Sequence, residues 1–434
     1  GDTAVLLRLL AHGGDQTLKD LRGMFAFAFH ERRSGHVLLA RDPLGIKPLY
    51  FASNPSSTQD WSLVFASEVR AIMASGLLGQ HRLDRQAVAS VLWNGFTVAP
   101  VTAVEGIESL LPGEAAWFDA SGRLLRRFIY WSAPMPGEAP VASEEELEAA
   151  LLESVRAHLI SDVPVGVFLS GGIDSSAVAN LATRSGGATI NTFTLAFNET
   201  ESNEGEIARQ VAEAIGTRHT EVLLTEQDFL ARLEPALNSQ DQPSFDGLKS
   251  YFMSHAVREA GFTVALVGSG GDELFGGYSS FRDLPRMMQV NRLLGITPEV
   301  GRRWMARGIR HLLQRPGQAY EPQTRWAKLP DMVCAGPVVA DLYQLAYALF
   351  LPDNQRALKK GPLCEQELVC GLPPMRYQAL QQEVAGRSDL AAIAMFEQRL
   401  FLGERLLRDA DATSMAASIE TRLPLVDADL LSVV

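Results

Sequence analysis

The chain has 434 residues, 47% hydrophobic and 21% charged, which indicates two or three globular domains and excludes a disordered or fibrous protein. Its net charge of −12 gives no overall attraction to nucleic acid or anionic membranes, although local basic patches are not excluded. The three cysteines, Cys334, Cys364 and Cys370, have the pattern of neither a disulfide framework nor a zinc site, and no apolar run is long enough to span a membrane. We therefore expect a cytoplasmic protein with no nucleic-acid or membrane partner.

Residues 1–131 predict a helix followed by an antiparallel layer. Apolar residues recur at helical spacing from Val5 to Leu10. Short apolar runs separated by turn residues then follow, at 24–29, 37–40, 48–51 and 63–66. Short strands without long helices between them are typical of an antiparallel sheet or sandwich. The proline-rich stretch 132–142 is expected to be a linker.

Residues 143–434 predict a second domain of the α/β class. Ser143 and Glu146 have the spacing of a capping box, which would begin a helix. Strands are expected at 165–169, 189–197, 221–224 and 263–268, and helices at 175–183, 204–215 and 250–260. This alternation indicates a parallel sheet with right-handed crossovers. Beyond about residue 282 the pattern is mostly helical.

The first chemically informative motif is Ser-Gly-Gly-Ile-Asp-Ser-Ser at 170–176, between a predicted strand and a predicted helix. Glycines allow a ligand to approach the backbone closely, and the amides of a helix N-terminus attract an anion such as phosphate. Asp174 would repel that phosphate unless a cation lay between them, and Mg²⁺ is the expected bridge. A ligand-free glycine turn is the alternative, but two glycines, three serines and an aspartate at a strand end favour a phosphate site.

A second glycine-rich loop follows another predicted strand, at 266–278. It carries two adjacent carboxylates, Asp272 and Glu273. If both loops lie at strand ends of one parallel sheet, Asp272 and Asp174 would share a metal ion, one ligand from each loop. The alternative is a flexible loop with a solvated acidic pair, which the presence of both loops disfavours.

The first motif resembles that of the PP-loop ATP pyrophosphatases, and both loops together resemble class B, glutamine-dependent asparagine synthetases. The resemblance covers nearly the whole chain. Further matching segments are Leu21–Phe27, Ala40–Tyr50, Ser67–Val69, Leu111–Gly113, Trp131, Ser414–Ala416 and Glu420–Asp427. It implies an N-terminal-nucleophile glutaminase sandwich at 1–131 and a PP-loop ATP pyrophosphatase domain at 143–434, with a parallel sheet and a helical C-terminal part.

The resemblance also implies an activity and its residues. Glutamine hydrolysis would release ammonia into an internal tunnel, and ATP would activate a carboxylate, aspartate in the type reaction, as an acyl-adenylate that ammonia converts to the amide. Asp272 and Glu273 would be catalytic, Asp174 and Asp272 would bind Mg²⁺, and Asp2 would hold glutamine. The ATP and pyrophosphate site would comprise Leu169, Ser170, Gly171, Gly172, Asp174, Ser175, Ser176, Leu195, Val267 and Gly268. Without the resemblance, Asp2 would be interpreted as a helix N-terminal residue, and Leu169, Leu195 and Val267 as core residues.

The sequence departs from the family pattern in three places. The glutaminase nucleophile is an N-terminal cysteine, but no cysteine precedes Cys334 here, and the family's late lysine is also missing. We therefore expect the natural protein to extend beyond both ends of this chain. Ser269 stands where the family has an acidic residue thought to handle protons during amidation, which leaves the acceptor carboxylate open.

Two other hypotheses remain from the sequence. A β-lactam-synthetase-like cyclase would use the same ATP loops with an internal amine as nucleophile. A non-catalytic module would bind ATP without turnover, which the intact loop at 170–176 disfavours. The acceptor of an amidotransferase would be aspartate or another carboxylate, such as a glycan or peptide acid. A homodimer is left open.

Overall fold

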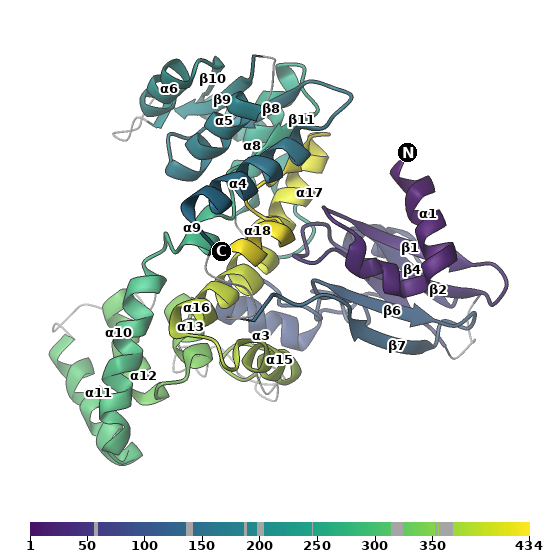
Figure 1. Ribbon diagram of the computed structural model, residues 1–434. Coiled ribbons are helices and arrows are strands. Elements are labelled where there is room, and N and C mark those ends of the chain that lie inside the picture. The colour runs from purple at the N-terminus through teal and green to yellow at the C-terminus, as the bar shows by residue number, and fades with distance from the viewer. Residues whose placement is uncertain are drawn as a thin grey trace.

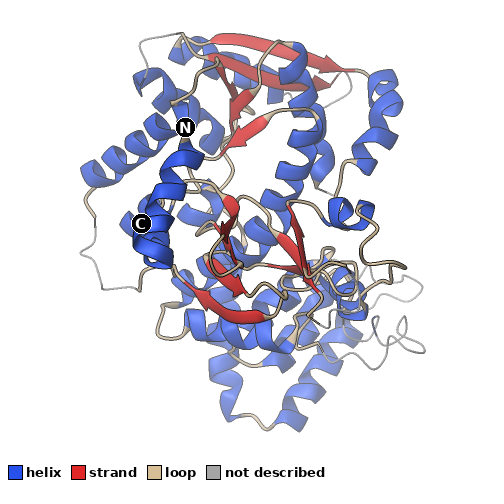
Figure 2. Cartoon of the chain, turned by 90° about the vertical axis from the view of Figure 1, so that its right-hand side faces the viewer, coloured by secondary structure: helices blue, strands red, loops and turns tan. Residues whose placement is uncertain are grey.

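The computed structural model describes residues 1–55, 60–135, 142–185, 189–197, 204–244, 246–313, 324–351, 355 and 368–434. Figure 1 shows an antiparallel N-terminal part, a parallel sheet surrounded by helices, and a helical part below that sheet, from which α10 (Ser280–Leu293), α11 (Glu299–Leu313) and α12 (Arg325–Ala335) project. In the turned view of Figure 2 the strands form two separate groups. The fold is therefore mixed α/β with a parallel sheet, as the sequence predicts. Within the described ranges, no helix is long and apolar enough to cross a membrane.

The N-terminal part is a sandwich of two antiparallel sheets, with strand orders β1-β2-β6-β7 and β4-β3-β5. Successive side chains of β2 point to opposite faces, as expected for a strand. Leu38 packs with Leu10 and Leu18 on the side of the first helices, and Leu39 packs with Phe51 of the second sheet. The elements are α1 (Asp2–Gly13), η1 (Gly14–Asp20), β1 (Ala26–Glu31), β2 (His36–Arg41), β3 (Tyr50–Ser53), β4 (Leu63–Ala66), α2 (Val69–Ala74), α3 (Arg85–Asn94), β5 (Glu108–Ser109), β6 (Glu114–Phe118) and β7 (Leu124–Ile129).

The parallel sheet has the strand order β10-β9-β8-β11-β12, and every neighbouring pair is parallel. The Ser143–Glu146 capping box is present at the start of α4. The predicted strands and helices of this region all form, with shifted ends. The elements are α4 (Glu144–Leu159), β8 (Val165–Phe168), α5 (Ile173–Ser185), β9 (Asn191–Phe197), α6 (Glu204–Ile215), β10 (Arg218–Leu224), α7 (Glu226–Asn238), α8 (Gly247–Glu259), β11 (Val264–Leu266), α9 (Gly271–Phe275) and β12 (Glu420–Arg422).

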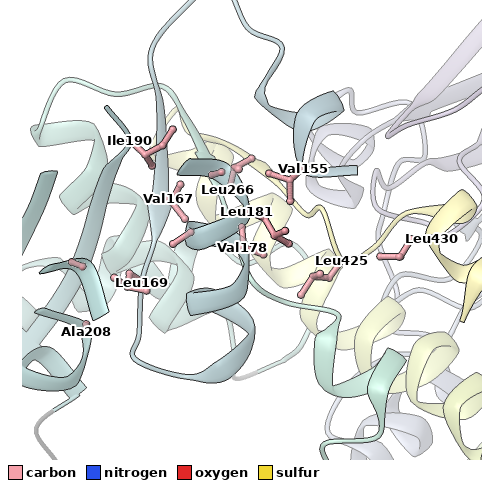
Figure 3. Close-up of a cluster of buried hydrophobic side chains, with 13 residues drawn as sticks. Val155, Val167, Leu169, Val178, Leu181, Ile190, Ala208, Leu266, Leu425 and Leu430 are labelled. Carbon is pink, nitrogen blue, oxygen red and sulfur yellow. The ribbon is translucent and has the colours of Figure 1, made fainter. Parts of the chain in front are cut away.

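Both faces of the central strands are covered by helices, as expected for this topology, so β11 is fully buried, whereas the edge strand β10 is largely exposed. On one face, Val167 and Leu266 pack against α4, α5 and α6 through residues such as Val155 and Val178 (Figure 3). On the other face, Phe168 packs against α7 and α8. This two-sided core fixes the carboxyl ends of β8 and β11 side by side, where the two glycine-rich loops begin.

The helical part contributes residues to the cavity described in the next subsection. Its elements are α10 (Ser280–Leu293), η2 (Leu294–Ile296), α11 (Glu299–Leu313), α12 (Arg325–Ala335), α13 (Val339–Tyr347), α15 (Pro374–Val384), α16 (Asp389–Phe396), the π-helix η4 (Glu397–Leu407), α17 (Arg408–Ala416) and α18 (Ala428–Val433). The predicted linker and Cys364 fall largely outside the described residues, because residues 136–141 and 356–367 are among those not described.

The N-terminal sandwich meets the rest of the chain along an apolar seam. Ile46 of the sandwich packs with Leu402, Leu423 and Val426, and this cluster is fully or nearly fully buried. An ion pair of 2.7 Å between Lys47 Nζ and Asp411 Oδ1 lies at the same interface. The loop 42–47 of the sandwich is thus held against the segment that follows β12.

Candidate functional site

A cavity of about 610 Å³ lies at the carboxyl ends of β8 and β11. One wall consists of the loops that follow these two strands. The opposite wall consists of the first turns of α8 and the junction of η4 with α17. This is the position at which open parallel sheets commonly bind ligands.

The loop after β8 is shaped by its own glycines and serines. Gly171 has φ +71°, and a Cβ there would lie 2.8 Å from Ile207, so this position requires glycine. The Ser175 hydroxyl accepts a hydrogen bond from the Ser170 amide at 3.1 Å. The loop therefore turns tightly into the N-terminus of α5, whose first amides face the cavity mouth and suit an anionic phosphate.

The loop after β11 approaches the first loop so closely that side chains would not fit between them. A Cβ on Gly268 would lie 2.6 Å from the Ser175 amide nitrogen. A Cβ on Gly271 would lie 2.4 Å from Asp174 Oδ2. Glycine at these two positions thus brings the carboxylate of Asp174 onto the backbone of the second loop.

Asp174 and Asp272 are electrostatically coupled. Burial, followed by the negative charge of Asp272, raises the pKa of Asp174, whereas a hydrogen bond from the backbone amide of Asp272 opposes that rise. Two neighbouring carboxylates, one from each loop, offer hard oxygen ligands of the kind that Mg²⁺ prefers. No group of three or more His, Cys, Asp or Glu side chains within the described ranges could hold a metal by itself, so phosphate oxygens and water would have to complete the shell.

Glu273 lines the cavity although only 1% of it is exposed. Burial raises its pKa to about 7. The Tyr278 hydroxyl donates a hydrogen bond to Glu273 Oε1 at 2.8 Å. A second buried acid, Glu397, accepts hydrogen bonds from the hydroxyls of Tyr343 and Tyr347, at 3.0 and 2.7 Å. The first hydrogen bond joins two residues of the second loop, and the other two join α13 to η4.

The opposite wall was not predicted from the sequence. Asp246, Lys249, Ser250 and Met253 lie three or four residues apart and so present one face of α8 to the cavity. Asp409 of α17 joins them, and burial raises its pKa. Because a polar helix face in a sequence is equally typical of a solvent-exposed helix, no local pattern marks these residues as a site.

Lys249 is the one cation among the described residues that line this cavity. Asp246 is paired with Arg405, and Asp409 accepts a hydrogen bond from Ser244. For Lys249 itself, the described residues provide neither an ion pair nor a hydrogen bond. The wall facing the phosphate loop therefore presents a positive charge for an anionic ligand.

Most of the predicted site residues come together in the cavity. They are Leu169, Ser170, Gly172, Asp174, Ser175, Val267, Gly268, Asp272 and Glu273. Gly171 and Ser176 belong to the same segment but do not line the cavity. The Ser176 hydroxyl donates a hydrogen bond to the Gly172 carbonyl. Leu195 is 8% exposed and packs in the core with Tyr251 and Phe252, so it does not line the cavity. Asp2 is an exposed residue in the first turn of α1, and its assignment to glutamine remains a prediction.

Comparison with protein families identifies the family to which the chain belongs. The family described as asparagine synthase matches residues 146–434, and the glutamine amidotransferase domain matches residues 1–131. The chain belongs to the asparagine synthase family. Its two glycine-rich loops and the cavity between them lie within the asparagine synthase match.

Two relatives illustrate the range of the family. Asparagine synthetase [glutamine-hydrolyzing] 1 of Bacillus subtilis is 28% identical over 438 residues, covering 98% of this chain and 63% of that protein. Amidase chry2 of Gibberella zeae is 30% identical over 303 residues, covering 65% of this chain and 44% of that protein. The chain thus spans about 63% of the length of the first of these relatives.

Solved structures give weaker matches. The NH3-dependent NAD synthetase of Campylobacter jejuni has a TM-score of 0.23 and 17% identity, covering 31% of this chain and 60% of that chain. The glutamine-dependent NAD+ synthetase of Acinetobacter baumannii, solved with ADP, has a TM-score of 0.25 and 13% identity, covering 64% and 65%. Scores this low carry no functional argument.

Proposed function

We propose that this chain activates a carboxylate with ATP and converts it to an amide with ammonia, releasing AMP and pyrophosphate. Residues 1–131 would form the glutaminase domain and residues 143–434 the synthetase domain, in a cytoplasmic protein. The observation that supports this function best is the pairing of Asp174 with Asp272 across the two loops, beside the amides at the start of α5. A phosphate-binding helix terminus and two metal-binding carboxylates in one cavity suit ATP chemistry in particular.

The chemistry follows from that arrangement. A carboxylate oxygen of the acceptor attacks the α-phosphorus of ATP, and the bond to pyrophosphate breaks. The nitrogen lone pair of ammonia then attacks the acyl carbon, AMP leaves with the electrons of the broken C–O bond, and the nitrogen loses a proton. Mg²⁺, held by Asp174 and Asp272, would neutralise charge on the departing pyrophosphate. The amides of residues 171–175 hold the phosphate oxygens in line for departure.

The acceptor occupies the wall opposite the phosphate loop in this proposal. Lys249 provides a positive charge there for an anionic acceptor, and Ser269, which stands in the place of an acidic residue, also lines the cavity. Aspartate is the first candidate because it is the acceptor in the type reaction of the family. A glycan or peptide acid is the second, because Ser269 leaves more space and less negative charge than an acidic side chain.

Ammonia would reach this cavity along the apolar seam. Two small cavities lie in a row there, and Leu44, Val426 and Asp427 line both of them. Gly270 lines the one next to the main cavity, and Met24 of the sandwich lines the other. Apolar residues line this path together with Asp42, His158, Arg399 and Asp427. Burial along the path disfavours the charged ammonium form.

The test is a product screen with the full-length protein, ATP and Mg²⁺. Aspartate and a panel of other carboxylates are supplied with either ammonium or glutamine, and AMP, pyrophosphate and the amide are quantified. We expect equal amounts of the three products with one acceptor. AMP formation without nitrogen uptake would favour the cyclase instead. Background pyrophosphate release with every acceptor and both nitrogen sources would contradict the proposal.

A further inference from the structure

The helices α10 and α11 carry an excess of positive charge that the proposed reaction does not use. We call residues 280–313 the arm, since they project from the body of the molecule in Figure 1. The arm contains seven arginines and two acidic residues, a net charge of +5, in a chain whose total is −12. Four of these arginines, Arg282, Arg292, Arg303 and Arg310, form ion pairs with Asp283, Asp389, Glu299 and Asp331. Its arginines are Arg282, Arg286, Arg292, Arg302, Arg303, Arg307 and Arg310.

The outer helix of the arm, α11, has apolar side chains on two faces. Ala306 is buried where α11 packs against α12. Val300 and Trp304, one helical turn apart, lie on the opposite face and are 65% and 67% exposed. Leu312, near the end of the helix, is 85% exposed. The described part of the chain leaves these outward apolar residues uncovered.

Neighbouring elements extend this apolar surface. Leu293, at the end of α10, is 76% exposed, and Trp326, at the start of α12, is 63% exposed. Single exposed apolar residues are common, but two tryptophans and three aliphatic residues on three successive helices, α10, α11 and α12, are typical of an interaction surface. The Arg307 guanidinium lies 5.7 Å from the centre of the Trp304 ring, which places positive charge directly beside this surface.

We propose that the arm binds the surface of an anionic lipid bilayer. Tryptophan and leucine side chains partition into the region between headgroups and acyl chains, while arginines on the same helix bind lipid phosphates. The chain as a whole is acidic, so the arm is the part that an anionic bilayer would attract. A bilayer surface accommodates both kinds of residue at once, with phosphates for the arginines and the acyl boundary for the tryptophans, and a protein partner that buries the same tryptophans is the alternative that the vesicle assay tests.

This proposal is independent of the proposed function. The arm extends away from the parallel sheet and its glycine-rich loops, so bilayer binding would leave the cavity accessible (Figure 1). It would bring the cavity close to acceptors that are themselves at the membrane. It also refines the argument from net charge, which excludes an overall attraction to membranes but not a local one.

The experiment is co-sedimentation of the full-length protein with vesicles. Vesicles of phosphatidylcholine mixed with phosphatidylglycerol are compared with vesicles of phosphatidylcholine alone, at low and high salt. We expect sedimentation with the anionic vesicles only, weakened by salt. The double variants Trp304→Ser/Leu312→Ser and Arg303→Glu/Arg307→Glu should each reduce the bound fraction by roughly tenfold or more.

The matched control is Arg123→Glu/Leu124→Ser on the N-terminal sandwich. Arg123 and Leu124 are also exposed, with 70% of the Arg123 side chain and 46% of Leu124 accessible. We expect it to sediment like the wild type. Circular dichroism checks that each variant is folded. Three results would each overturn the proposal: no binding of the wild type to anionic vesicles, equal binding to neutral vesicles, or an equal loss of binding in the control. Light scattering that shows the arm mediating a dimer instead would also overturn it.

Discussion

The two walls of the cavity are built in different ways. The phosphate wall consists of two short loops in which backbone amides, glycines and two carboxylates provide the contacts. The opposite wall consists of side chains on α8 and α17, and its charged groups are Lys249, Asp246 and Asp409. In our proposal the phosphate wall binds the phosphates of ATP, which every such adenylation reaction uses. The opposite wall, which we call the side-chain wall, selects the acceptor.

The largest expected effect is on the phosphate wall. Asp174→Asn or Asp272→Asn removes one of the two carboxylates proposed to hold Mg²⁺, and we expect AMP formation to fall by roughly a thousandfold, about 4 kcal/mol. The fold should survive, because removing one of two like charges that interact relieves repulsion. Glu213→Gln on α6, at a side chain that is 67% exposed, is the control. AMP formation at the wild-type rate in either Asp variant would refute the metal assignment.

The close approach of the two loops gives the next prediction. In Gly268→Ala the new Cβ would meet the Ser175 amide at 2.6 Å, so we expect a destabilisation of roughly 1–3 kcal/mol. Gly172→Ala lies in the same region, but its nearest atom is Ser170 Oγ at 3.4 Å. Thermal unfolding without ATP should therefore show a lower Tm for Gly268→Ala and little change for Gly172→Ala. Equal Tm values would show that the loops can separate freely.

The side-chain wall is tested by Lys249→Met. Loss of one charge-assisted contact should raise the KM for the acceptor by roughly ten- to a hundredfold while changing the KM for ATP much less. Lys249→Arg, which keeps the charge, should recover part of the loss. If the KM for ATP changes instead, Lys249 contacts a phosphate and the division between the two walls is wrong.

This contrast also explains what could be predicted from the sequence. Residues 170–176 and 266–278 are local motifs in which glycine, serine and aspartate act within a few residues of each other, so their sites could be identified without a structure. Lys249 and Asp409 line one cavity only because α8 and α17 pack together, although the two residues are 160 positions apart in the chain, and no local pattern encodes that packing. Strand β12 was missed for the same reason, since it joins β11 from a distant segment.

The smallest expected effect is on stability and concerns Lys328, a cation outside both walls of the cavity. Lys328 is 9% exposed, and burial lowers its pKa from 10.5 to about 8. Between these two pH values the unfolded chain binds more protons than the folded chain, so the free energy of unfolding should rise with pH. Lys328→Met should flatten that rise in urea melts measured from pH 8 to 10.5. An unchanged slope would show that Lys328 is solvated in the folded protein.

The most direct test of the central claim is ATP cleavage in the presence of ammonium and the accepted carboxylate. We predict that the full-length wild-type protein forms AMP, pyrophosphate and amide in equal amounts, and that Asp174→Asn and Asp272→Asn form none above background. Formation of ADP and phosphate, or equal AMP formation by the wild type and both variants, would contradict the assignment of this cavity to carboxylate adenylation.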